Sequence, residues 1–202
     1  MGNMNKKVWV TSMLAIAFFA VVMSSYRSEN TSVLKKTDNS VTELILNSYS
    51  PRNFSSVPVS MGDLEMILKC GIKAPSAANR QPWKFIVVRN FPVMQQMIAN
   101  VTEGNVLITI CGVEAQAGST VDFDCGLATE NMTVAAQSLG LGARIYAGPI
   151  GNINSTMKQT LQIPDGYRAV VVLRVGHIEN VADAVSTATP RNSYEDVVTF
   201  LK

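Results

Sequence analysis

Histidine and cysteine are scarce in this 202-residue sequence, which contains one histidine and three cysteines. Cys70, Cys111 and Cys125 lack the close spacing of zinc-binding cysteines, and His177 alone could add an imidazole ligand. A serine hydrolase is disfavoured too, because His177 would have to be its base. We therefore expect no bound metal, and we interpret the three cysteines as small core residues.

A strong net charge is also missing. The 17 Lys and Arg residues nearly balance the 15 Asp and Glu residues, so the net charge of +2 gives no field that would attract a nucleic acid. No G-x-G-x-x-G segment follows a predicted strand, so a Rossmann nucleotide site is not indicated. With 47% hydrophobic residues and no internal repeat, the chain can bury one ordinary core.

The N-terminus has the pattern of a targeting segment. Lys6 and Lys7 precede an apolar run from Val8 to Met23, which predicts a secretory signal peptide over residues 1–24. The alternative is an uncleaved membrane anchor, since the run is just shorter than a usual spanning helix. Residues 25–40 are polar and predict a flexible linker. We expect an exported protein, either periplasmic or membrane-anchored and facing outside the cytoplasm, that meets the membrane only through this segment if it is uncleaved.

The folded domain is expected to comprise residues 41–202, where helical and strand patterns alternate irregularly. Helices are predicted over 40–47, 60–73, 91–100, 123–139, 154–162 and 194–201, and strands over 83–88, 105–111, 143–146 and 169–175. This order predicts an α+β fold with a mixed, mostly antiparallel sheet flanked by helices.

Three separated stretches carry the functional signal. They are SPRNF at residues 50–54, APSAANRQPW at 74–83, and PR at 190–191. Together they resemble the nitroreductase family, which has R-R-S-x-R-x-F after its first helix, A-P-S-x-x-N-x-Q-P-W before its first main strand, and an arginine near its end. The middle motif is the most specific, because all its fixed positions match in order. The resemblance covers most of residues 41–202 and implies a three-layer nitroreductase-like fold.

The resemblance implies bound FMN, whose phosphate is a dianion. Arg52 and Arg191 match the arginines that would hold it, and a guanidinium offers a permanently charged fork of donors. Ser50 matches a serine that donates its hydroxyl to a phosphate oxygen. The family's first arginine is missing, because Ser48 stands at its position. Arg52, Arg191 and Arg80 would then have to carry the phosphate charge.

Other matched residues would face the flavin ring. Asn79 and Gln81 offer amides that suit the carbonyl and N–H edge of an isoalloxazine, and Ser76 lies in the turn that brings backbone groups close to it. Ala147 and Gly148 match the place where the family points backbone N–H groups at the flavin N5. No side chain is expected to act as a catalytic acid or base, since the chemistry is centred on the flavin.

The resemblance thus predicts an FMN-dependent oxidoreductase. It would transfer hydride or electrons from NAD(P)H or another donor to a small-molecule acceptor such as a nitroaromatic or a quinone. It also implies a homodimer with FMN between the subunits. One alternative is a non-catalytic exported flavin-binding or scaffold protein, and another is an enzyme that uses FMN for a specialised oxidation or ring-forming step.

Overall fold

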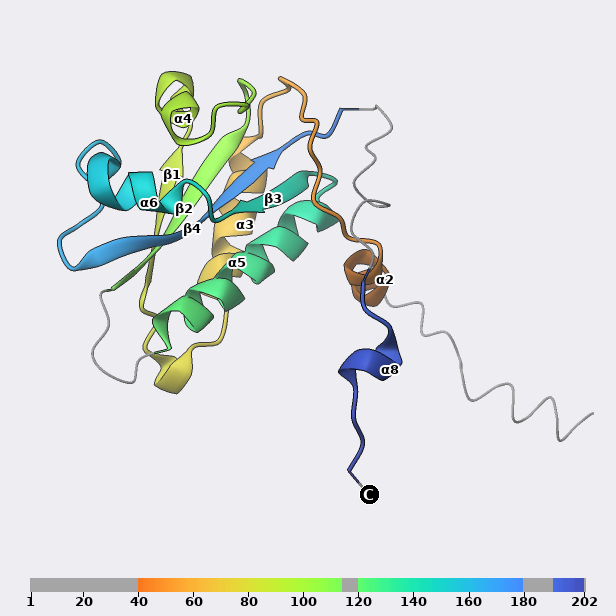
Figure 1. The fold of residues 1–202 in the computed structure, drawn as a ribbon. Helices are drawn as coiled ribbons and strands as arrows, with labels where there is room; N and C mark the ends of the chain where they lie inside the picture. The colour runs from red at the N-terminus through yellow and green to blue at the C-terminus, as the bar shows by residue number, and fades with distance from the viewer. Residues whose placement is uncertain (1–39, 114–119, 180–190, 202) are drawn as a thin grey trace, which may run out of the picture. The chain divides into compact units, whose positions relative to one another are not determined.

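The computed structural model describes residues 40–113, 120–179 and 191–201 (Figure 1). The sheet and the helices packed on it belong to one compact unit, Thr42–Lys202. The signal peptide and linker predicted over residues 1–40 fall almost entirely outside the described residues and stay predictions. In the ranges that the structure describes, no helix is both long enough and apolar enough to cross a membrane.

Four strands form one sheet in the order β1-β2-β4-β3. The strands are β1 Trp83–Val88, β2 Val106–Val113, β3 Gly142–Tyr146 and β4 Tyr167–Gly176. Every neighbouring pair among these strands is antiparallel. β2 and β4 lie in the middle, which explains their nearly continuous apolar sequences.

The described helices are α2 Ser40–Leu46, α3 Met61–Ile72, the 3-10 turn η1 Ala77–Asn79, α4 Phe91–Met97, α5 Val121–Ser138, α6 Ile150–Asn152 with the π-helical η2 Ile153–Met157, and α8 Tyr194–Val197. α3 begins where predicted because the Ser60 side chain accepts a hydrogen bond of 3.0 Å from the backbone N–H of Asp63. α5 ends just before Gly140, whose φ of 75° suits a residue that follows a helix end. The α+β prediction is confirmed.

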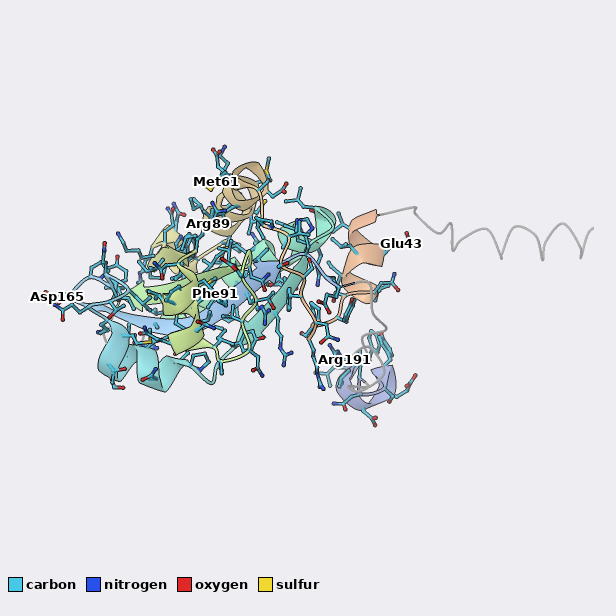
Figure 2. The ribbon with its side chains drawn as sticks, turned by 90° about the horizontal axis from the view of Figure 1, so that it is seen from above. Glu43, Met61, Arg89, Phe91, Asp165 and Arg191 are labelled. Atoms are coloured by element: carbon cyan, nitrogen blue, oxygen red, sulfur yellow. The ribbon has the colours of Figure 1, made fainter. Side chains whose placement is uncertain are left out.

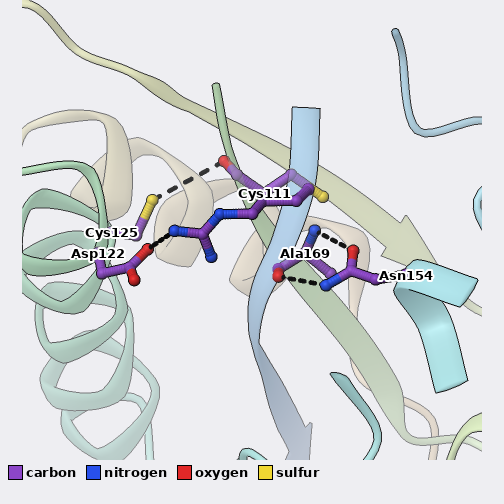
Figure 3. Close-up of polar contacts among 6 residues, drawn as sticks. Cys111, Asp122, Cys125, Asn154 and Ala169 are labelled. Atoms are coloured by element: carbon purple, nitrogen blue, oxygen red, sulfur yellow. Dashed lines mark hydrogen bonds and ion pairs between the residues drawn. The ribbon is translucent and has the colours of Figure 1, made fainter. Parts of the chain in front are cut away.

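Three helix predictions were wrong at their boundaries, and the one over 91–100 ends at Met97. The helix expected over 154–162 lies earlier, over α6 and η2, and its side chains Ile153 and Met157 are buried. Asn154 fixes it to β4: its amide donates to the carbonyl of Ala169 at 3.0 Å and accepts from that residue's N–H at 2.8 Å (Figure 3). The last helix ends at Val197 rather than at residue 201.

Helices cover both faces of the sheet. In β2, Ile108 and Ile110 belong to the core shared with α3 and α5, whereas Leu107 and Cys111 belong to the core shared with α4 and η2 (Figure 1). This follows from the alternation of side chains along a strand. The result is a three-layer arrangement of helices, sheet and helices, as predicted.

The buried cysteines give a prediction about pH. Cys111 and Cys125 are fully buried on opposite faces of the sheet, and Cys125 Sγ lies 3.8 Å from the carbonyl oxygen of Cys111 (Figure 3). Burial raises the pKa of the Cys111 thiol to about 11 and that of Cys125 to about 12. The unfolded chain releases these protons from about pH 9. The folded chain keeps them, so the free energy of unfolding should fall as pH rises from 9 to 11.

Denaturant unfolding between pH 8 and 11 measures this effect, and a Cys111→Ala/Cys125→Ala variant should show a shallower fall. In the native protein at pH 8, a thiol reagent should modify the half-buried Cys70 first. Rapid modification of all three thiols under those conditions would contradict the assignment.

Candidate functional site

A cavity of about 600 Å³ lies on the face of the sheet that carries α4. Two chain segments and two strands form its wall. Its lining residues come from 52–54, from 98–102, from Arg144 and Tyr146 of β3, from Arg174 of β4, and from Glu179. The volume is in the usual range for a small-molecule or cofactor site.

Arg174 is the most deeply buried charged residue of this wall, with 2% of its surface exposed. Its Nε donates to Asn105 Oδ1 at 2.8 Å, its Nη1 to the carbonyl of Asn100 at 3.0 Å, and its Nη2 to Thr102 Oγ1 at 3.0 Å. Its guanidinium also lies 4.1 Å from the centre of the Phe54 ring. The group is therefore held rigidly.

Burial lowers the pKa of Arg174, a hydrogen bond with Tyr146 raises it, and the charge of Arg144 lowers it further. Arg144 is its direct cross-strand partner, and the Arg144 guanidinium lies 5.0 Å from the centre of the Tyr146 ring. Neither arginine was among the predicted site residues. A single arginine inside the apolar strand sequence AVVVLRVG is the signal that could have revealed Arg174.

Of the predicted phosphate ligands, Arg52 lines the cavity. Its segment passes close to β3, because a Cβ at Gly142 would come within 2.9 Å of Pro51 and 3.1 Å of Phe54. Ser50 is exposed two residues earlier. Arg191 is exposed in the segment 191–201 and is not part of the cavity wall (Figure 2). Glycine at position 142 thus lets the chain carry Arg52 across the end of the sheet.

The predicted loop before β1 is held in an unusual backbone conformation. Ala78, Asn79 and Gln81 have φ values of 51°, 55° and 48°, in the left-handed region that side chains disfavour. The Ser76 hydroxyl accepts from the N–H of Gln81 at 2.9 Å, and Gln81 Nε2 donates to Asn79 Oδ1 at 3.2 Å. Such strain is typical of functional loops that their surroundings hold in place.

A buried carboxylate anchors this loop to α5. Asp124, which is 2% exposed, accepts from the N–H of Ala77 at 3.1 Å and from the Thr120 hydroxyl at 3.3 Å. Asp124, in the first turn of α5, therefore supports the loop.

The structure does not bring the two predicted halves of the site together. The loop at 76–81 precedes Trp83, which pairs with Gly112 at the end of β2. The segment that carries Arg52 lies beside Gly142 and Gly176 through Pro51 and Phe54, near the start of β2. At about 3.3 Å per strand residue, the two ends of β2 are roughly 20 Å apart. Ala147 and Gly148 directly follow the cavity residue Tyr146 and so belong to the half that contains Arg52.

Comparison with known proteins agrees with this architecture. The family model described as Nitroreductase family matches residues 45–107 and 104–177. The chain belongs to the nitroreductase family.

Individual nitroreductase relatives align over most of their length. A protein of Archaeoglobus fulgidus, whose name proposes an NADH dehydrogenase/NAD(P)H nitroreductase, is 32% identical over 152 residues, which cover 70% of this chain and 87% of that protein. A crystal structure from Desulfovibrio desulfuricans, described as a proposed nitroreductase in complex with FMN, has 25% identity and a TM-score of 0.69. The match covers 82% of this chain and 99% of that one. A nitroreductase with bound FMN from Desulfitobacterium hafniense shares the fold at 24% identity and a TM-score of 0.68, over 81% of this chain and 99% of that one. The predicted nitroreductase fold is confirmed.

Proposed function

We propose that the protein is an FMN-dependent oxidoreductase that transfers hydride or electrons from NAD(P)H or another donor to a small-molecule acceptor such as a nitroaromatic or a quinone. Membership of the nitroreductase family supports this function, as do relatives described with FMN or with NAD(P)H in their names. The observation that carries the proposal is the cavity in which Arg52 meets the strand leading to Ala147 and Gly148.

The residues of the cavity fit FMN chemically. In the part of the wall that the structure describes, the guanidinium groups of Arg52, Arg144 and Arg174 stand against one carboxylate, that of Glu179, which suits a ligand with a dianionic phosphate. The aromatic rings of Phe54 and Tyr146 add apolar surface for a ring system. Bound FMN would supply hydride acceptance and donation, and the protein would bind and orient it.

In this proposal Arg52, Arg191 and Ser50 hold the phosphate, and the backbone N–H groups of Ala147 and Gly148 face the flavin N5. Backbone donors fixed at that atom would stabilise negative charge on the ring. Gly148 has no Cβ and so permits close approach, and the space beside it is open, since a Cβ built there would meet no atom within 4 Å.

We further propose that the functional unit is a homodimer in which Ser76, Asn79 and Gln81 come from the second copy. The roughly 20 Å between this loop and the Arg52 half of the site supports such an arrangement. The terminal segments supply apolar surface for it: α2 exposes 49% of Ile45 and 77% of Leu46, and the chain end exposes 74% of Phe200. These side chains would be covered if the terminal segments pack against a second copy.

The test is a visible absorption spectrum of the purified full-length protein after addition of FMN and desalting, followed by NADH or NADPH without oxygen. We expect flavin bands that stay with the protein, bleach with a donor and return with a quinone. Bound flavin that no donor bleaches would favour the non-catalytic alternative. A colourless protein would overturn the cofactor assignment and would show that the arginine missing at Ser48 is decisive.

A further inference from the structure

Two arginines face each other across neighbouring strands in the cavity wall. Arg144 of β3 and Arg174 of β4 are direct cross-strand partners, so their side chains lie on the same face of the sheet. Like charges in this position destabilise a sheet. One of the pair, Arg174, is also almost fully buried. The arrangement is unfavourable unless something of opposite charge binds beside it.

The described part of the chain places no carboxylate against Arg174. None of its hydrogen-bond partners is a carboxylate: they are an amide oxygen, a backbone carbonyl, the Thr102 hydroxyl and Tyr146. Among the described residues no carboxylate pairs with it. A guanidinium has five N–H donors, so these four bonds leave one donor available. A buried cation without a counter-ion is costly, and a bound anion would relieve that cost.

The rest of the cavity wall also favours a bound anion. Arg52 adds a third cation to the cavity, and among the described lining residues only Glu179 carries a carboxylate. Because Arg174 is held by its hydrogen bonds and Arg144 lies directly opposite it on the adjacent strand, the pair needs little rearrangement to receive a negative charge. This fixed charge comes from the sheet and not from the motif in which Ser48 replaces an arginine.

We propose that Arg144 and Arg174 form an anion-binding site in the cavity that takes the negative charge of the bound flavin. The inference rests on the proposed function. That charge has two sources in FMN, the phosphate and the ring when it is reduced and anionic. Both sources present oxygen or nitrogen acceptors that guanidinium groups recognise.

The experiment compares dissociation constants of the full-length protein for FMN and riboflavin, each oxidised and each reduced with dithionite, by flavin fluorescence and absorbance. The variants are Arg144→Gln and Arg174→Met, with Lys84→Gln as the matched control. Lys84 is exposed on β1, so its substitution removes one positive charge outside the cavity wall. Arg144→Gln keeps the test valid if Arg174→Met fails to fold, since Arg144 makes only one long hydrogen bond, 3.5 Å to the carbonyl of Pro51.

We expect the two cavity variants to bind at least one anionic form of the flavin about tenfold or more weakly than the wild-type protein does. This is the effect of losing a hydrogen bond to a charged group. The Lys84→Gln control should bind every form with wild-type affinity. Weaker FMN binding with unchanged riboflavin binding assigns the site to the phosphate. Weaker binding of both reduced flavins, beyond that of the oxidised ones, assigns it to the ring. Equal affinities in all variants overturn the inference and leave the proposed function intact. A wild-type protein that binds no flavin overturns the proposed function itself.

Discussion

Replacing Arg52 with alanine is expected to weaken FMN binding by roughly tenfold to a hundredfold without unfolding the protein. A hydrogen bond to a charged group contributes about 1.5–3 kcal/mol, and about 1.4 kcal/mol corresponds to a factor of ten in affinity. Arg52 is exposed and lines the cavity, so its removal opens no gap in the core. The dissociation constant for FMN and the thermal midpoint of the apoprotein measure the two effects separately.

Arg191→Ala should behave in the same way, because the family resemblance places it at the same phosphate. Lys73→Ala is a suitable control, since Lys73 is an exposed cation at the end of α3 and outside the cavity wall. If the phosphate is the partner, both arginine variants should lose affinity for FMN and keep their affinity for riboflavin. Unchanged FMN binding in both variants would contradict the phosphate assignment.

Local sequence patterns predicted the elements of the sheet well. β1 has the predicted bounds of Trp83–Val88, and α3 begins at its predicted Ser60 cap. These features depend on neighbouring residues: alternation along a strand, and a hydroxyl placed three residues before a backbone N–H. The helix predicted at 154–162 was misplaced, because its position depends on contact with β4 through Asn154 and Ala169. Contacts between distant segments leave no local pattern.

The site residues also divide into those that a local motif predicts and those that depend on contacts between distant segments. Motif resemblance identified Arg52 and the loop at 76–81, but the register of four antiparallel strands decides that they lie at opposite ends of the sheet. The left-handed backbone of Ala78 could not be predicted either, because alanine disfavours that region and is held there by contacts such as that of Asp124 with the loop. Arg174 was missed because its role appears only when its strand lies beside β3.

A mixing experiment with two defective variants is expected to recover flavin binding that neither variant has alone. Arg52→Ala damages one half of the proposed site, and Asn79→Gly damages the other. Glycine is the right replacement at position 79, because the φ of 55° there suits glycine and only the amide is lost. If each site combines Arg52 of one copy with the loop of the other, a mixed dimer contains one intact site and one doubly defective site.

With equal amounts and random pairing, about half of the dimers are mixed, and one of the two sites in each mixed dimer, about half of the sites of the mixed species, should bind FMN as tightly as the wild-type protein. Co-expression of the two variants with different affinity tags, followed by flavin titration of the mixed species, measures this fraction. Carrying both substitutions on the same copy and pairing it with a wild-type copy is the matched control. In that pair each site has one defect, so no tight site should remain. Mixed dimers that form without regaining tight binding would show that Arg52 and Asn79 do not serve the same flavin.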